Sequence, residues 1–301
     1  MTYFSTFIPG LGEIVRDHLV KKLEGFKLEL LLDGLVVYSS TSNIEKIKLL
    51  KFLNNSFLLV NPEEKLKISL GKSFRVVFSR ENELVAVNKE RLARIESKIA
   101  KLNNLIIDRA DPDFEFWFLE RREGQRFTGV RITKHPDYKT VLAKGQLRPE
   151  LAHLLCLISE PNKEDIVLDP FAGSGAIGMA RKNYPYQKTI SGDQNPANAS
   201  IKKLNALDLE DFKNNSVSKI ITDPPWGISI GKDLDLNDFY SKMLQEFSRV
   251  LKPRGLLITL IGQKELFENV LRKSPNFSLV KRYNILVSGK KAAIYKIKVA
   301  Y

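Results

Sequence analysis

An apolar segment that runs directly into a glycine-rich turn is the feature that most restricts how this chain can fold. Residues 166–168 (IVL) precede the segment 169–178, DPFAGSGAIG, which opens a helical pattern. Gly173 and Gly175 permit a tight turn with positive φ and let a ligand lie against the backbone. The order strand, glycine turn, helix is typical of a parallel α/β sheet covered by helices.

The remainder of the C-terminal half continues this pattern. Helices are predicted at residues 151–158 and 237–251, the second ending before Pro253 and Gly255. Further strands are predicted at residues 189–192, 219–222 and 255–261. Residues 283–288 and 292–299 flank a glycine turn and predict an antiparallel hairpin. We therefore expect an α/β, Rossmann-like domain that ends in an antiparallel hairpin.

The N-terminal half predicts a smaller α+β region. Strands are expected at residues 3–8, 28–32, 35–38, 73–79, 106–107, 114–119 and 127–132, and helices at residues 14–23, 44–53 and 88–103. The last of these helices has an apolar face and is otherwise rich in lysine and arginine. We place the domains at residues 1–65, 66–133 and 147–301, with a linker at 134–146.

Asp169 separates two possible ligands of the glycine turn. The turn also satisfies the G-x-G-x-x-G pattern of dinucleotide sites, with Asp193 at the end of the next strand. A carboxylate at position 169 would repel a pyrophosphate but would favour the ammonium and sulfonium of S-adenosylmethionine. Asp193 suits ribose hydroxyls in either case, and Asp208 is the expected contact to the adenine ring. We interpret the turn as a methyl-donor site.

The segment 220–227, IITDPPWG, carries the strongest chemical signal. A strand delivers a carboxylate, two prolines hold the backbone rigid, and an aromatic ring follows. An exocyclic amine on a base is a poor nucleophile, and hydrogen bonds to Asp223 and to the Pro224 carbonyl would fix and orient it. Asp223 would then take the released proton. Trp226 would stack on the extruded base, worth roughly 1–3 kcal/mol.

Charge and cysteine content restrict the partners and the compartment. The chain has 48 basic and 35 acidic residues, a net charge of +13, which favours polyanions such as nucleic acid. A single cysteine excludes a disulfide framework and a cysteine-rich metal site, and we expect no metal. The N-terminus resembles neither a signal peptide nor a transit peptide. We expect a cytoplasmic monomer.

Together the motifs resemble a known family. DPFAGSGAIG, GDQNP and TDPPWG are similar to class I methyltransferases that act on amino groups. Upstream, SFRVVFSREN, DPDFEFWFLERREGQRFTGVRIT and GQLRPELAHLLCLIS resemble the THUMP-containing RNA guanine methyltransferases. The resemblance implies a ferredoxin-like piece at 1–65, a THUMP module at 66–133, and methylation of the 2-amino group of guanosine in transfer RNA. It also implies that the THUMP module grips the 3′ end of the acceptor arm.

The resemblance implies roles for individual residues. The expected catalytic residues are Asp223, Pro224, Pro225 and Trp226. The expected cofactor residues are Asp169, Pro170, Phe171, Ala172, Gly173, Gly175, Asp193, Gln194, Asp208, Leu209 and Pro149. The expected RNA contacts are Arg75, Arg80, Arg91, Arg94, Lys98, Lys101, Lys144 and Arg148. Two departures from the family stand out: residues 194–211 leave little room for the usual helix, and Trp226 replaces the Tyr or Phe of many relatives.

Three alternatives remain open from the sequence. A DNA amino-methyltransferase acting on adenine or cytosine uses the same D-P-P-W logic but needs a target-recognition region. A protein glutamine methyltransferase presents an amide nitrogen to such a motif but gives no reason for the net charge of +13. An RNA-binding protein with an inactive transferase fold would have no need of an intact Asp223.

Overall fold

The computed structural model describes residues 1–81, 83–122, 124–133, 146–227 and 233–300. The chain divides into two units. The first unit contains Met1–Phe7 and Val15–Pro136, and the second contains Ile8–Ile14 and Asp137–Tyr301. Lys144 and most of the predicted linker at 134–146 lie outside the described residues. The described helices include none that is long and apolar enough to cross a membrane.

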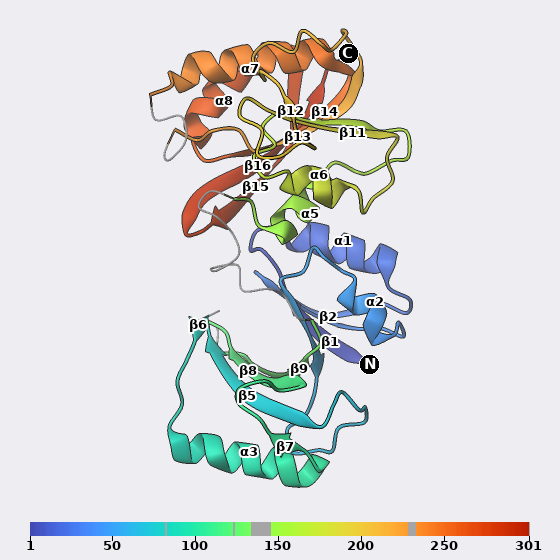
Figure 1. Ribbon diagram of the computed structural model, residues 1–301, viewed down its shortest axis with the longest axis vertical. Helices are drawn as coiled ribbons and strands as arrows, with labels where there is room; N and C mark the ends of the chain where they lie inside the picture. Colours follow the sequence, from blue (N-terminus) through green and yellow to red (C-terminus); the bar gives the residue numbers. More distant parts are fainter. Residues whose placement is uncertain (82, 123, 134–145, 228–232, 301) are drawn as a thin grey trace. The chain divides into compact units, whose positions relative to one another are not determined.

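The first unit is built on one nine-stranded sheet (Figure 1). Its strands are β1 (Thr2–Thr6), β2 (Lys27–Leu32), β3 (Leu35–Ser39), β4 (Asn55–Leu59), β5 (Ser73–Arg80), β6 (Glu83–Leu84), β7 (Ile106–Ile107), β8 (Phe114–Glu120) and β9 (Arg126–Arg131). They run in the order β2-β3-β1-β4-β9-β8-β5-β6, with β7 beside β5. Because β4 pairs with β9, the regions on either side of residue 65 share one continuous sheet.

Aromatic side chains fill the interior of the first unit. Phe4 and Phe57 stack with ring centroids 4.6 Å apart, in a cluster that also contains Leu119. The helices α1 (Gly12–Lys22) and α2 (Ile44–Lys48) bury Val15, Leu19 and Ile47.

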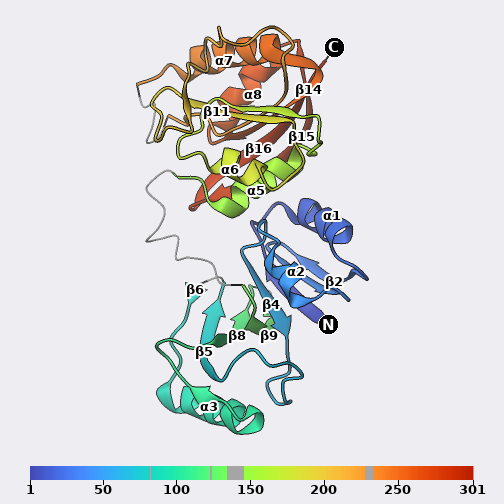
Figure 2. The same ribbon diagram turned by 45° about the vertical axis from the view of Figure 1, so that its right-hand side comes forward.

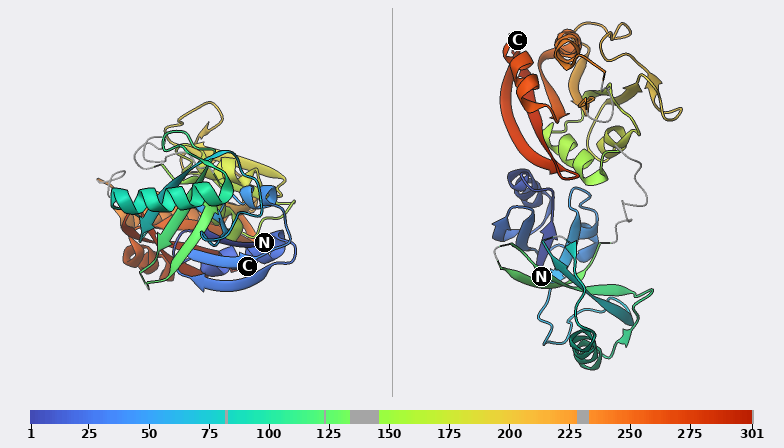
Figure 3. Two further views of the ribbon diagram at one scale, coloured as in Figure 1. Left: turned by 90° about the horizontal axis from the view of Figure 1, so that it is seen from below. Right: turned by 90° about the vertical axis from the view of Figure 1, so that its left-hand side faces the viewer.

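A second cluster lies under the helix α3 (Lys89–Asn103), which crosses the strands on one face of the sheet (Figure 3). Ile99 of α3 packs with Phe74 of β5 and Phe116 of β8. The Asn88 side chain caps the first turn by accepting hydrogen bonds from the N–H groups of Glu90 and Arg91, and the helix ends at Asn104 in the left-handed region. This capping and the apolar face explain why the predicted helix at 88–103 is confirmed.

The second unit is a seven-stranded sheet with helices on both faces (Figure 2). Its strands are β10 (Ile166–Asp169), β11 (Lys188–Asp193), β12 (Lys202–Lys203), β13 (Val217–Thr222), β14 (Leu251–Ile261), β15 (Phe277–Val287) and β16 (Lys290–Val299). Their order is β12-β11-β10-β13-β14-β16-β15, parallel from β12 to β14 and antiparallel where β16 meets β14 and β15. The predicted α/β fold with a terminal antiparallel hairpin is confirmed.

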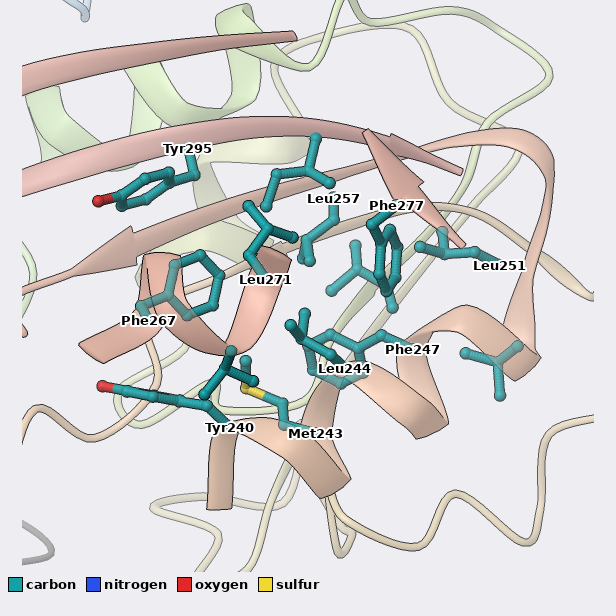
Figure 4. Packing of buried hydrophobic residues seen from close by; sticks show 14 of the residues in the cluster. Tyr240, Met243, Leu244, Phe247, Leu251, Leu257, Phe267, Leu271, Phe277 and Tyr295 are labelled. Carbon is teal, nitrogen blue, oxygen red and sulfur yellow. The ribbon is translucent and has the colours of Figure 1, made fainter. Parts of the chain in front are cut away.

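The helices α5 (Pro149–Ile158) and α6 (Ala176–Arg181) lie on one side of this sheet, and α7 (Leu236–Val250) and α8 (Lys264–Arg272) on the other (Figures 1 and 2). Met243, Leu244 and Phe247 of α7 pack against Leu257 of β14 in the main core cluster (Figure 4). Burying such side chains is worth roughly 1.5–3 kcal/mol each, so this packing holds α7 firmly against the sheet.

Two sequence predictions about helices had different outcomes. The helix predicted at residues 44–53 is wrong beyond Lys48, where α2 ends. Tight turns follow, with Leu50 N donating to Ile47 O and Leu53 N to Leu50 O, and they bury the apolar side chains that produced the helical pattern. The expectation that residues 194–211 hold no helix is confirmed, because these described residues form turns and the short strand β12.

Candidate functional site at the carboxyl edge of the second sheet

Three carboxylates gather where the strand order of the second sheet reverses. Asp169 ends β10, Asp193 ends the neighbouring strand β11, and Asp223 follows β13 on the other side of β10. The register pairs Leu168 with Ile220, so the ends of β10 and β13 lie side by side. Ligands of open α/β sheets bind at such a reversal, outside the carboxyl ends of the strands. The predicted catalytic and cofactor motifs therefore meet at one edge.

The glycine turn lies directly against this edge. Gly173 and Gly175 have φ values of +50° and +84°, in the region that glycine adopts without strain. Gly173 N donates to Asp193 Oδ2 at 2.8 Å, and Asn195 N donates to Asp193 Oδ1 at 2.9 Å. A side chain added at Gly173 would meet no atom within 4 Å, so the turn is open above this residue.

Asp169 is a buried carboxylate with one oxygen left over. The residue is 2% exposed, and its Oδ1 accepts hydrogen bonds from Thr222 Oγ1 at 2.8 Å and from Phe171 N at 3.3 Å. Its Oδ2 is buried and has no hydrogen-bond partner in the part of the chain that the structure describes. Burial, with the charges of Asp223 and Asp193 adding to it, raises the pKa of Asp169 to about 7 despite the two hydrogen bonds. A buried acceptor without a donor costs free energy that a cationic ligand would recover.

Among the described residues, Asp223 has a neutral donor and takes part in no ion pair. Trp226 Nε1 donates to Asp223 Oδ1 at 2.9 Å and, at 3.3 Å, to the carbonyl of Leu260 on β14. The residue is partly exposed. Burial of the carboxylate group nevertheless raises the pKa of Asp223 to about 7, with the Trp226 hydrogen bond opposing the rise. A carboxylate with such a pKa can accept and release a proton near neutral pH.

Pro225 and Trp226 are held in place by α7 and by the residue that follows β14. The Tyr240 hydroxyl on α7 donates to the Pro225 carbonyl at 3.0 Å. The Trp226 ring lies against Gly262, where an added Cβ would come within 2.5 Å of Cε3 of the ring. Gly262 therefore cannot carry a side chain without displacing the indole.

The remaining predicted cofactor residues differ in their contacts and in their burial. Phe171 packs against Phe239 of α7, with ring centroids 5.7 Å apart. Ala172 N donates to the Gly192 carbonyl of β11. Pro170 is buried, Gln194 is exposed beside Asp193, and Pro149 is exposed at the first position of α5.

Asp208 and Leu209 follow β12 and lie near the last turns of α7. Asp208 N donates to Asn205 O, and the charge of Asp208 acts on Arg249. Leu209 is fully buried, with its N–H on Glu246 Oε2 and its carbonyl on Arg249 Nη2. No hydrogen bond or ion pair among the described residues joins the Asp208 side chain to the glycine turn, so its role stays a prediction.

The described residues predicted to contact RNA fall into two groups. Some are paired with carboxylates: Arg75 with Glu115, Arg80 with Glu120, Lys98 with Glu63 and Arg148 with Glu150. Arg91, Arg94 and Lys101 are exposed on α3 and take part in none of the ion pairs among the described residues. The exposed side of α3 therefore retains net positive charge.

Sequence reasoning missed three residues of this edge: Thr222, Tyr240 and Gly262. Thr222 could have been found, because it precedes Asp223 on a strand that neighbours the one ending at Asp169. Tyr240 and Gly262 gave no signal, since one lies within an amphipathic helix and the other after a strand that carries no motif.

The arrangement fits S-adenosylmethionine. Among the described residues Asp169 Oδ2 is buried without a donor and suits an ammonium, and Asp193, which is partly exposed and accepts from the glycine turn, suits hydroxyl groups. Asp223 lies close enough for its charge to act on Asp169, so a second substrate held there would lie beside the cofactor.

Comparison with known proteins agrees with this geometry. A family model described as an RMKL-like methyltransferase domain matches residues 136–181 and 187–293, half of the chain. The tRNA (guanine(6)-N2)-methyltransferase of Thermus thermophilus is 25% identical over 226 residues, covering 69% of this chain and 67% of the relative. Its namesake from Methanocaldococcus jannaschii is 20% identical over 374 residues, covering 96% and 97%. The solved structure of TrmN from Thermus thermophilus shares the fold, with a TM-score of 0.76, 22% identity and 99% coverage of both chains.

Proposed function

Because the chain belongs to the RMKL-like methyltransferase domain family, we propose that it transfers a methyl group from S-adenosylmethionine to the exocyclic 2-amino group of a guanosine in transfer RNA. The observation that carries this proposal is the position of Asp223 and Pro224 beside Asp169, at the reversal of strand order. The names of the two relatives, both tRNA guanine-N2 methyltransferases, support the choice of nucleotide and of RNA.

The chemistry of the amine explains why such residues are needed. The lone pair of the guanine 2-amino group is delocalised into the ring, so the nitrogen is a weak nucleophile. Hydrogen bonds from its two N–H groups to Asp223 Oδ2 and to the Pro224 carbonyl would hold the nitrogen in an orientation suited to attack. When bound, the cofactor supplies an electrophilic methyl carbon on a sulfonium. As the N–C bond forms and the C–S bond breaks, Asp223 accepts the proton that the amine loses.

Residues of the glycine turn would hold the cofactor. Asp169 Oδ2 would accept from the ammonium, and Asp193 from the ribose hydroxyls. Gly173 and Gly175 let the backbone approach closely, and Phe171, Asp208 and Leu209 would surround the rest of the ligand. The buried, unpaired oxygen of Asp169 supports this assignment because the ammonium would satisfy it.

The first unit would bind the RNA. We propose that residues 66–133 form a THUMP-like module that grips the 3′ end of the acceptor arm, with residues 1–65 as a ferredoxin-like piece, and that the protein acts as a cytoplasmic monomer. The unpaired Arg91, Arg94 and Lys101 on α3 support a phosphate-binding role for this unit. The domain boundaries at 65, 133 and 147 belong to the same proposal.

Product analysis tests the proposal. The protein is incubated with labelled S-adenosylmethionine and unmodified transfer RNA, the RNA is digested, and the labelled nucleoside is identified and mapped. We expect N2-methylguanosine at one position. Duplex DNA and glutamine-containing peptides serve as competing substrates in parallel reactions. Label in methyladenine, methylcytosine or methylglutamine, with none in RNA, would overturn the assignment.

A further inference from the structure

The residues 223–226, here called the Asp-Trp corner, present several hydrogen-bond acceptors close together. Asp223 has two carboxylate oxygens, and Pro224 and Pro225 each have a carbonyl. A primary amine has only two N–H groups. With four acceptor atoms available, an amine could be held in several orientations, and only some of them aim its nitrogen at a methyl carbon. Two hydrogen bonds within the protein restrict these orientations.

Trp226 takes one oxygen of the carboxylate. Its indole N–H donates to Asp223 Oδ1 at 2.9 Å and shares a weaker bond of 3.3 Å with Leu260 O. The ring lies on Gly262, and no larger residue would leave room for it. The indole is therefore fixed by a backbone bond at its edge and by glycine against its face, and its N–H in turn fixes the rotation of the carboxylate.

Tyr240 takes one of the two carbonyls. Its hydroxyl donates to Pro225 O at 3.0 Å. Its ring is fully buried and packs edge-on against Phe239 and Phe267, with ring centroids 5.5 Å away in both cases. In Figure 4, Tyr240 lies at the border of the core cluster. Because the ring is packed in this way, the position of the hydroxyl is fixed beside the Pro225 carbonyl.

Two acceptors remain. Within the described part of the chain, no donor bonds to Asp223 Oδ2 or to the Pro224 carbonyl. We infer that Trp226 and Tyr240 are positioning residues, whose hydrogen bonds fix the rotation of the Asp223 carboxylate and the Pro225 carbonyl so that Asp223 Oδ2 and the Pro224 carbonyl are the acceptors presented to a primary amine. The inference rests on the proposed function and adds two residues that select the geometry of the amine.

The inference also determines how the site should respond to pH. Among the described residues, the titratable groups that face Asp223 are Asp169 at the end of β10 and the Tyr240 hydroxyl on α7. The Trp226 N–H stabilises the charged form of Asp223. Its loss would raise the pKa of Asp223, so that a higher pH is needed to ionise the carboxylate.

The test uses two substitutions with matched controls. Trp226→Phe keeps an aromatic ring and removes the N–H, and Trp117→Phe removes the same donor from a carboxylate of the first unit, where Trp117 Nε1 bonds to Glu115 Oε2 at 2.8 Å. Tyr240→Phe removes the hydroxyl, and Tyr295→Phe removes one that donates to Glu268 Oε1 at 2.6 Å from the same core cluster. Thermal unfolding, binding of cofactor and RNA, and kcat from pH 5 to 9 are measured for each.

We expect Trp226→Phe to lower kcat by about 10- to 100-fold, with the acid limb of its pH profile moved to higher pH, and to leave KM for RNA nearly unchanged. Tyr240→Phe should lower kcat by about 10-fold without moving the limb. Gly262→Ala, which displaces an intact Trp226, should reproduce the Trp226→Phe profile. Both matched controls should keep the wild-type kcat.

Two results would overturn the inference: an unmoved acid limb in both Trp226→Phe and Gly262→Ala, or equal losses of kcat in the matched controls. Failure of the proposed function is a separate outcome, because the wild-type protein would then form no methylguanosine at all.

Discussion

An indole N–H donates to a carboxylate in each unit of this protein, and the two carboxylates differ in their surroundings. In the first unit, Glu115 accepts from Trp117 and also from Arg75 and Arg131. Burial acts to raise the pKa of Glu115, but the hydrogen bonds from Trp117 and Arg75 and the two arginine charges outweigh burial and lower it. In the second unit, Trp226 is the one side-chain donor to Asp223 among the described residues, and burial raises the pKa of Asp223 to about 7.

The difference separates a carboxylate that stabilises a fold from one that can exchange a proton. Glu115 joins β5, β8 and β9 through its arginine partners, and all of its oxygens are satisfied. Among the described residues, no donor bonds to Asp223 Oδ2 and no cation forms an ion pair with Asp223. Charge pairing therefore predicts a structural role for the first and a chemical role for the second.

Neutralising Asp223 is expected to have the largest effect on kcat, and neutralising Glu115 should have none. Asp223→Asn should lower kcat by roughly 10²- to 10⁴-fold, because it removes the proton acceptor, while RNA affinity stays within about twofold. Glu115→Gln should leave kcat unchanged. Single-turnover methylation and filter binding measure the two quantities. Substantial turnover by Asp223→Asn would remove Asp223 from the reaction.

Reversing the charge on α3 should affect RNA binding, which is the role proposed for the first unit. Replacing Arg91, Arg94 and Lys98 with Glu should weaken RNA binding by about 10- to 100-fold at low salt. It should also flatten the salt dependence, by about 0.7–0.9 in slope for each phosphate that the variant no longer neutralises. The contribution of Lys98 should be the smallest, since it already pairs with Glu63.

The matched control for α3 reverses Lys213, Arg254 and Lys273, which are exposed near the amino end of the second sheet. This variant changes the net charge equally and should bind RNA almost as the wild type does. Equal losses of affinity in both triple variants would mean that only the overall charge matters.

The pH dependence of cofactor binding tests the role of Asp169, the second carboxylate whose pKa is raised. Only ionised Asp169 attracts an ammonium, and its pKa is raised to about 7, so affinity should increase by about 10-fold between pH 6 and pH 8. Calorimetric titration at several pH values measures this. Asp169→Asn should bind more weakly at pH 8 and with little pH dependence. A steep pH dependence retained in Asp169→Asn would assign the effect to another group.

The smallest effects are expected on thermal stability, where Asp223→Asn and Glu115→Gln should change the Tm at pH 8 in opposite directions. The folded-state pKa of Asp223 lies above its ordinary value of 3.8, so folding loses stability as pH rises from about 4 through about 7. Asp223→Asn should therefore raise the Tm at pH 8 by about 2–4 °C and have little effect at pH 4.

Glu115→Gln should lower the Tm at pH 8 by about 2–6 °C, because hydrogen bonds to a charged group are removed and both arginines are left without their partner. Thermal unfolding at pH 4 and pH 8 distinguishes the two variants. A decrease in Tm for Asp223→Asn at pH 8 would show that its charge is stabilised in the fold.

Much of the site could be predicted from the sequence because its carboxylates end strands. A parallel sheet brings the carboxyl ends of its strands to one edge, so Asp169, Asp193 and Asp223 had to meet once their strands were recognised. The tertiary partners could not be predicted. Whether the Tyr240 hydroxyl reaches Pro225 depends on the rotation of α7, and the place of Gly262 under Trp226 depends on where β14 ends.

The first unit was less predictable for a related reason. Its strands were found from their alternating pattern, but strand order in an antiparallel sheet depends on packing between distant segments. No sequence motif indicates the pairing of β4 with β9, which joins residues 55–59 to residues 126–131. The ends of α2 and the position of Asp208 likewise follow from burial and from interactions with distant elements.

At saturating S-adenosylmethionine, where the ionisation of Asp169 no longer limits the rate, the pH profile of kcat/KM for wild-type protein and transfer RNA tests the central claim most directly, since it reports the ionisation of Asp223 before the RNA binds. The account predicts a rate that rises tenfold per pH unit on the acid side and levels off near pH 7, a limb that Asp223→Asn lacks. A rate independent of pH between 5 and 8, or an identical limb in Asp223→Asn, would contradict it.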